Sequence, residues 1–565
     1  MSGAQENTSF EVQVLQDKHW VIAEMAGDEG KAKAFLENLL QTGNHEAVRV
    51  VKDYRRIDGT HSETVVVEKK ADQKAALPVQ LSAITEAPPC SALADYYALP
   101  ARLTMGRLLR KYFDEVFITP TELLHSAAEL KRFGDKDRLL FSACDRVAFL
   151  QAHAAGEDGK TRREALDKAW TDINARAKAA AAMKLPAVKT LEEVQKAATA
   201  AGDQRDYVAH VLMCQALIEK RSWIGKVDLL LAWAAEPNGA EAMPMIDGVI
   251  ADILVSAQFI QDLLGFQSNL AAALCSLCDL AEGKAEAAKF APATFTALNK
   301  LFAEGRLPQC RQVLLSRVSR ETAGTNPLSR NEPKQEYEMF HKVLHRQLGH
   351  QGVLGGPAAA EALLQRGARV YNAGGATLTA MQALDFMMSS LTEGCLKVQY
   401  LACLAESPLG VSMAEVLVEV LETLVRGAIH IDAWVPVRVP PRDRMAALCA
   451  ANRAVRSGVL PDDIRKVLGN HIDEVLSRYL LDEQIIEKID KPDDPLALRA
   501  IRLIKFCGSG VLIEGKSLDL ARQRVIEHLK QKQFEEKFLA SVPDPVQAEK
   551  HLREFHRLLV ETGFR

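Results

Sequence analysis

The sequence predicts a mainly α protein, a multi-helix bundle or irregular α-solenoid-like array, preceded by a small N-terminal α+β domain of ββαββ order. Two observations support this fold class. The 565 residues are 48% hydrophobic but only 6% aromatic, with alanine-rich tracts that favour helices over sheets. From residue 91 onward, apolar residues recur with helical spacing between turn signals that suit helices of about 10 to 20 residues.

The first 90 residues differ from the rest. Residues 1–9 are expected to be disordered, and residues 10–70 to form the α+β domain, with "FEVQVL", "HWVIAEM", "EAVRVVKDY" and "ETVVVEKK" extended and "DEGKAKAFLENLL" helical. Asp28 should cap the helix, Gly43 and Asn44 should end it, and "IDGT" (57–60) should turn a hairpin. Residues 71–90, rich in lysine, proline and small side chains, predict a linker.

The helical part is expected to divide at two breaks. The predicted segments are a helical domain at 91–325, a helical domain or continuation at 326–440, and a C-terminal helical domain at 441–565. The first break is the turn-rich stretch around residues 323–333. The second is "HIDAWVPVRVPPRD" (430–443), whose prolines and alternating valines predict an extended crossover.

Composition gives no indication of a nucleic-acid or membrane partner. A net charge of −4 gives no overall field toward nucleic acid or an anionic membrane. The N-terminus lacks a secretory pattern and no apolar run reaches about 18 residues, so we expect a cytoplasmic protein without membrane insertion. The ten cysteines lie mostly in apolar helical contexts, which is typical of reduced thiols that pack as small hydrophobes.

One stretch, "GSGVLIEGKS" (508–517), matches the phosphate-loop pattern of nucleotide triphosphatases through Gly510, Gly515, Lys516 and Ser517. That loop needs a buried strand before it, but "DDPLALRAIRLIKFC" predicts an amphipathic helix. The sequence therefore favours a helix ending at Gly508, a short extended "VLIE", and a new helix capped by Ser517. The remaining alternative is an anion held by Lys516 at a free helix N-terminus.

Two residue pairs have metal-ligand spacing. Cys275 and Cys278 form one Cys-x-x-Cys, but they lie within a predicted helix, and core packing is the favoured interpretation. His341 and His345 lie one helical turn apart, although a zinc protease would need glutamate where Lys342 stands. The pairs could share one ion only if the fold brought their helices together. No metal and no cofactor are predicted.

The segment from Arg306 to Arg369 is the most basic part of the helical region, with ten lysines and arginines against five acids. Solvated helix faces with local ion pairs are the favoured interpretation. The alternative is recognition of an acidic partner or a phosphate-bearing ligand.

No esterase, zinc-protease, dinucleotide or kinase motif occurs, so no catalytic residue is assigned. We expect a non-enzymatic interaction, scaffold or regulatory protein with protein partners and without nucleic acid. The alternative is a helical small-ligand- or anion-binding protein, or an enzyme, with a cleft near residues 306–369. A metal-bound helical domain is a third hypothesis. The sequence fixes neither the partners nor the oligomeric state.

Overall fold

The computed structural model describes residues 8–16, 19–41, 47–55, 61–70, 81–136, 138–286, 293–329, 333–371 and 377–564. They form two compact units. The first is Met1–Leu81 with Gly134–Ser142, and the second is Ser82–Phe133 with Ala143–Arg565.

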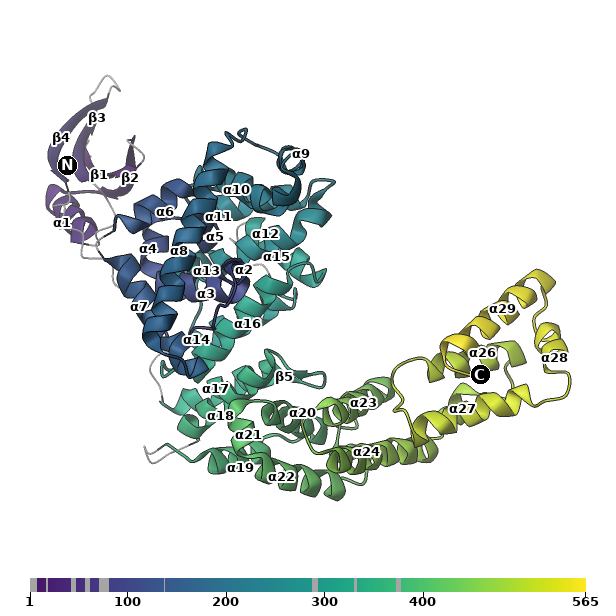
Figure 1. Cartoon of the computed structure of the whole chain (residues 1–565). Coiled ribbons are helices and arrows are strands. Elements are labelled where there is room, and N and C mark those ends of the chain that lie inside the picture. The colour runs from purple at the N-terminus through teal and green to yellow at the C-terminus, as the bar shows by residue number, and fades with distance from the viewer. Residues whose placement is uncertain are drawn as a thin grey trace, which may run out of the picture. The chain divides into compact units, whose positions relative to one another are not determined.

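The N-terminal unit contains the predicted ββαββ arrangement, which confirms this part of the fold class (Figure 1). Its elements are β1 (Thr8–Gln16), β2 (His19–Ala26), α1 (Glu29–Gln41), β3 (Ala47–Arg55) and β4 (His61–Lys70). The strands pair antiparallel in the order β2-β1-β3-β4. The sheet begins at Thr8, inside the segment 1–9 that the sequence predicts to be disordered.

Side-chain alternation builds the core of this unit. Val12 and Val14 in β1 and Val48 and Val50 in β3 are buried in one cluster with Leu36 of α1. Residues two apart in a strand share a face, so this pattern places one face of the sheet against the helix.

The cap predicted for α1 is present, because the Lys31 N–H donates to Asp28 Oδ1 at 2.8 Å. The predicted helix end at Gly43 and Asn44 lies outside the described residues, as does the hairpin turn at 57–60.

The rest of the chain is mainly α, as predicted. Its helices in chain order are α2 (Leu93–Tyr97), α3 (Leu99–Leu108), α4 (Arg110–Val116), α5 (Pro120–His125), α6 (Ala127–Gly134), α7 (Leu139–Ala155), α8 (Gly159–Ala182), α9 (Leu191–Thr199), α10 (Arg205–Ile218), α11 (Trp223–Ala234), α12 (Gly239–Ile253), α13 (Ala257–Leu264), α14 (Leu270–Ala281), α15 (Ala293–Ala303), α16 (Pro308–Ala323), α17 (Pro333–Gln347), α18 (Gly356–Val370), α19 (Ala380–Ser390), α20 (Gly394–Ala405), α21 (Pro408–Ser412), α22 (Ala414–Gly427), α23 (Pro441–Ser457), α24 (Asp462–Asp482), α25 (Ile485–Ile489), α26 (Leu496–Cys507), α27 (Lys516–Leu529), α28 (Phe534–Ala540) and α29 (Pro545–Glu561). Two 3₁₀ turns, η1 (Gly202–Gln204) and η2 (Ile431–Ala433), and a short hairpin of β5 (Leu348–Gly349) and β6 (Gly352–Val353) complete it.

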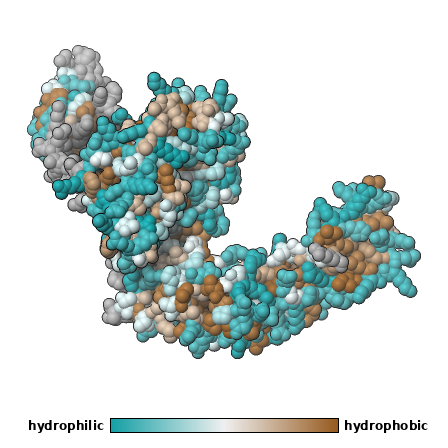
Figure 2. All heavy atoms as spheres, viewed as in Figure 1, coloured by the Kyte–Doolittle hydropathy of each residue, from teal (hydrophilic) through white to brown (hydrophobic). Residues whose placement is uncertain are grey.

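Two large buried clusters organise the helices from α9 onward. The larger contains residues from Val188 to Ile513 and includes residues on both sides of the predicted boundaries at 325 and 440. The smaller, from Ile486 to Phe555, lies among α25 to α29. On the face that Figure 2 shows, this last part of the chain carries hydrophobic residues surrounded by hydrophilic ones. The predicted domain boundaries within the helical part stay predictions.

Two irregular segments show how tertiary contacts act on the chain. Leu81–Cys90, the described part of the predicted linker, has no regular structure, yet Ile84 and Ala87 are buried. The predicted extended crossover at 430–443 is wrong: the chain forms η2 and turns before α23 begins. Trp434 is fully buried there and its Nε1–H donates to the Ala428 carbonyl at 2.8 Å, so aromatic burial outweighs the valine alternation.

Among the described residues, no single helix is long and apolar enough to cross a membrane. Helices α12 and α13 meet that length and composition only as a pair bent by 100°.

Candidate functional site

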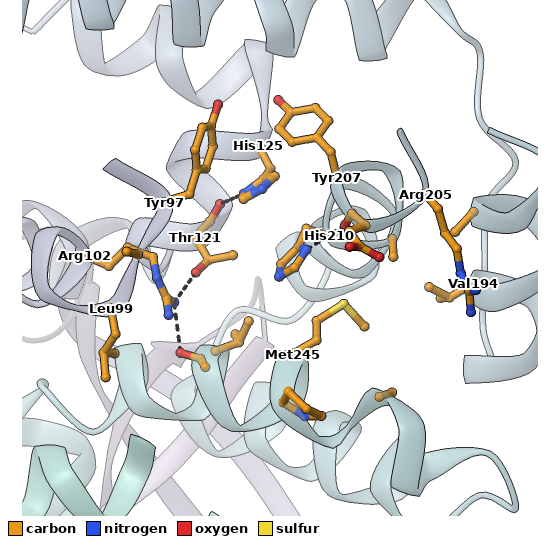
Figure 3. Close-up of a pocket in the computed structure, with 18 of the residues that line it drawn as sticks. Tyr97, Leu99, Arg102, Thr121, His125, Val194, Arg205, Tyr207, His210 and Met245 are labelled. Carbon is orange, nitrogen blue, oxygen red and sulfur yellow. Dashed lines mark hydrogen bonds between the residues drawn. The ribbon is translucent and has the colours of Figure 1, made fainter. Parts of the chain in front are cut away.

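A cavity of about 600 Å³ lies among helices α2, α3, α5, α8, α9, α10 and α12 of the second unit (Figure 3). We call it the histidine pocket, after His125 and His210 in its lining. Apolar side chains of Leu99, Val194 and Met245 also face it. It is the place among the described residues where buried cations, imidazoles and aromatic rings converge.

Arg102 of α3 is anchored beneath the pocket by groups from two other helices. Its Nη1 donates to Asp252 Oδ1 at 2.7 Å, to Thr121 Oγ1 at 2.6 Å and to the Gly248 carbonyl at 3.0 Å. Thr121 in turn donates its hydroxyl to Asp252 Oδ2 at 2.6 Å. A side chain at Gly248 would place Cβ 3.2 Å from Arg102 Nη2, so glycine lets the guanidinium approach. The Nε of Arg102 is buried without a hydrogen-bond partner.

A second buried ion pair supports the same short helix. Glu122 of α5 accepts hydrogen bonds from Lys226 of α11 and, at 2.8 Å, from the Thr119 N–H. Lys226 also donates to the Leu217 carbonyl at 2.8 Å, and both charged side chains are fully buried. Because α5 has only six residues, these contacts, and not helix length, fix the position of His125 at its C-terminal end.

The two histidines have the same hydrogen-bonding arrangement. His125 Nδ1 lies 2.8 Å from the Thr121 carbonyl, and His210 Nδ1 lies 2.7 Å from the Asp206 carbonyl. A carbonyl can only accept, so each Nδ1 carries the proton and donates it. Their rings stack with centroids 5.1 Å apart. In a neutral imidazole this arrangement leaves Nε2 as a hydrogen-bond acceptor.

Burial keeps both rings neutral. It lowers the pKa of His125 to about 3, with the nearby His210 adding to the effect. The pKa of His210 is also lowered, again mainly by burial. The pocket thus presents two uncharged acceptors at neutral pH.

Acidification should therefore destabilise the protein through His125. The unfolded state binds a proton near pH 6.5 while the folded state does not, so the free energy of unfolding should fall between pH 6.5 and about 3. At pH 5 the loss from this one group should be about 2 kcal/mol. Urea denaturation at pH 7.5 and pH 5 measures it. His125→Asn keeps an N–H donor near the position of Nδ1. Between pH 7.5 and pH 5, its free energy of unfolding should fall by about 2 kcal/mol less than that of the unchanged protein. The same pH dependence in both proteins would contradict the assignment.

Aromatic rings and arginines complete the pocket. Tyr97 and Tyr207 meet edge to face with centroids 5.9 Å apart, and the Arg176 guanidinium lies 3.9 Å from the centre of the Tyr207 ring. Burial raises the pKa of both phenols, so both stay protonated. Both rings lie beside His125, whose centroid is 4.9 Å from that of Tyr207.

The cysteine and histidine pairs of the sequence analysis lie elsewhere. Cys275 and Cys278 are both buried in α14, where burial raises the pKa of Cys278 to about 12. Helix α14 does pack against α17, since Cys275 Sγ lies 4.0 Å from the Lys342 carbonyl. However, the described residues contain no group of three or more histidines, cysteines or acids placed to hold a metal ion. His341 and His345 interact with each other, their ring centroids 6.0 Å apart.

The phosphate-loop match is a helix junction. α26 ends before Gly508, as predicted, and α27 begins at Lys516, so its N-cap is Gly515 and not the predicted Ser517. Asp473 of α24 provides the missing cap, accepting from the Lys516 N–H at 2.6 Å and the Ser517 N–H at 3.0 Å. The carboxylate occupies the place that an anion would take.

Three arginines of the basic segment from Arg306 to Arg369 donate to carbonyls near helix ends. Arg317 donates to the Leu254 carbonyl near the end of α12, at 3.2 Å, and Arg366 donates to the Thr322 carbonyl near the end of α16, at 2.8 Å. Arg369 donates to the Ala323 and Gly324 carbonyls, both at 2.7 Å. These contacts account for three of the ten lysines and arginines of the segment without any ligand.

The histidine pocket was not predicted from the sequence. Its key contacts join residues far apart in the chain: Arg102 and Asp252 are 150 positions apart. The one local signal was "TPTELLH", whose Thr119 and Glu122 form a capping box and so mark the start of a helix ending in His125.

Comparisons of the chain with protein-family models, with curated proteins and with solved structures find no match.

Proposed function

We propose that this helical chain binds a small, mostly apolar molecule carrying hydrogen-bond donors, in the histidine pocket. The supporting observation is the stacked pair of His125 and His210, whose neutral rings have their Nδ1 protons committed to backbone carbonyls. Each Nε2 is then an acceptor that a ligand hydroxyl or N–H group can satisfy. An ether or ketone of the same shape cannot satisfy it, because it has no hydrogen-bond donor.

The lining favours an uncharged ligand with a flat body. Arg102 is neutralised by Asp252, and the other two arginines of the lining, Arg176 and Arg205, are equal in number to its two acids, Asp206 and Glu241. The imidazole and tyrosine rings offer flat surfaces for a planar group. A volume of about 600 Å³ suits a small organic molecule.

Binding is proposed here, and not catalysis, because the threonine hydroxyl in the pocket lining, that of Thr121, is already committed. Thr121 Oγ1 accepts from Arg102 and donates to Asp252. It is therefore positioned as part of the pocket floor and is not poised as a nucleophile. The interaction, scaffold or regulatory role expected from the sequence stays a prediction, as do its protein partners.

Resorcinol tests this proposal, because its two hydroxyl groups on a flat ring can reach two acceptors. We expect a Kd of about 1 mM or tighter by ligand-detected NMR, a scale set by its eight heavy atoms. 1,3-Dimethoxybenzene, which has the same ring but no donors, should bind at least about tenfold more weakly.

His210→Phe supplies the matched variant, since it keeps a flat ring and removes the acceptor. Resorcinol should bind it about tenfold more weakly than the unchanged protein. His430→Phe, at an exposed position outside the pocket, should leave binding unchanged. Equal binding of the two compounds, or unaltered affinity in His210→Phe, would overturn the proposal.

A further inference from the structure

A second cavity, of about 900 Å³, lies along α16 where the β5–β6 hairpin and the start of α18 meet it. We call it the α16–α18 cleft. It falls within the basic segment of the sequence, and Arg311 and Arg320 both line it. The histidine pocket shares none of its lining residues, so the two sites can be considered independently.

The cations of this cleft differ in how they are paired. Arg346 donates to Asp279 at 2.6 Å and to Glu282 at 2.7 Å, and His350 Nε2 lies 2.6 Å from Glu393. Arg320, by contrast, donates to the Ser316 hydroxyl at 2.9 Å, and no carboxylate among the described residues forms an ion pair with it or with Arg311.

Other arginines intensify the positive charge near Arg320. Partial loss of hydration and the neighbouring Arg107 and Arg317 lower the pKa of Arg320 to about 10, although its side chain reaches solvent. It therefore remains charged at neutral pH, in a place where cations outnumber the acids that could neutralise them. An added anion would relieve this repulsion.

The start of α18 faces the same cleft with backbone donors. Its N-cap is Gly355, at φ 96°, which offers no side-chain cap, and Gly355, Gly356 and Ala358 all line the cavity. The first N–H groups of a helix lack partners within the helix and attract negative charge. Gly355 approaches α16 closely: a Cβ there would lie 3.4 Å from Ser319 Oγ. On α16, Arg320 directly follows Ser319, and Arg311 lies about two helical turns before Ser319, on the opposite side of the helix from Arg320.

A buried amide points to the same ligand chemistry. Gln347 lines the cleft with only 1% of its surface exposed, and its Oε1 has no hydrogen-bond partner. Its Nε2 lies 3.3 Å from the Thr322 hydroxyl. A hydroxyl can donate as well as accept, so the amide can turn over, take its hydrogen bond at the oxygen, and present its NH₂ as a free donor.

We propose that the α16–α18 cleft binds the phosphate group of a small phosphorylated molecule. Arg311 and Arg320 supply the charge, and the α18 N-terminus and the Gln347 amide supply neutral donors. A cleft of about 900 Å³ is far larger than phosphate alone, so most of it would hold the remainder of the molecule.

Isothermal titration of the full chain with glucose 6-phosphate, inorganic phosphate and glucose, at constant ionic strength, tests this inference. We expect both phosphates to bind and glucose not to bind. Tighter binding of glucose 6-phosphate assigns the site to a phosphorylated small molecule, and equal binding assigns it to phosphate itself. If neither phosphate binds at millimolar concentrations, the inference is wrong.

Variants locate the binding. Arg311→Ala with Arg320→Ala should weaken phosphate binding by at least about tenfold, because both arginines of the cleft that lack a carboxylate partner among the described residues are lost. Arg426→Ala, an exposed arginine on α22, makes the same kind of change outside the cleft and should leave affinity unchanged. Unaltered affinity in the double variant would overturn the assignment, and its melting temperature shows whether the fold is intact.

Discussion

Replacing Lys226 with methionine is expected to lower the free energy of unfolding by about 3 to 5 kcal/mol. Lys226 and Glu122 are both fully buried, so removing the ammonium leaves a carboxylate without its counter-ion in a dry interior. The backbone donor at Thr119 satisfies only part of its hydrogen-bonding capacity. Urea denaturation at pH 7.5 measures the loss.

A second variant separates the buried charge from side-chain packing. Glu122→Gln combined with Lys226→Met leaves no ion in the interior and keeps nearly the same volumes. It should therefore be clearly more stable than Lys226→Met alone. A single variant as stable as the double variant would show that the ion pair is not the cause.

Asp252→Asn should lower the free energy of unfolding by a similar amount, about 3 to 5 kcal/mol. Here the charge left without a partner is positive. The change leaves the Arg102 guanidinium, with 8% of its side chain exposed, without a negative partner. It also weakens the contact to Thr121, which precedes His125 by one helical turn. We therefore expect weaker resorcinol binding together with the lower stability.

Asp262→Asn is the matched control for this loss. It removes the same charge from an exposed position on α13 and should change stability by less than about 0.5 kcal/mol. Equal effects of the two substitutions on thermal unfolding would contradict the role given to Asp252.

Local pattern was enough to predict the elements whose signals lie within one segment. The valine-rich stretches "EAVRVVKDY" and "ETVVVEKK" predicted β3 and β4, Asp28 predicted the start of α1, and the arginine-faced stretch after Pro495 predicted α26. Each depends on the period of apolar residues or on a cap within three positions. Such signals are reliable because the residues that carry them are neighbours in the sequence and also make the stabilising contacts in the folded chain.

Features that depend on distant residues could not be predicted in this way. Ser517 is of a residue type that often caps helices, but the N–H groups at the start of α27 donate instead to Asp473 of another helix. Burial of Trp434 and Val435 after the 3₁₀ turn η2 replaces the extended structure that the valine-rich stretch predicted. His125 and His210 become a site only because Arg102, Asp252 and the other buried contacts bring α5 and α10 together. No spacing in the sequence encodes that meeting.

The most direct test of the histidine pocket is a ¹⁵N–¹H correlation spectrum of histidine side chains, recorded at pH 7 with and without resorcinol. We expect His125 and His210 to be neutral, with the proton on Nδ1, because both Nδ1 atoms face carbonyls. Their Nε2 signals should shift on titration, while those of His430 stay in place. Charged rings, protons on Nε2, or unchanged Nε2 signals at saturating resorcinol would contradict the proposed binding site.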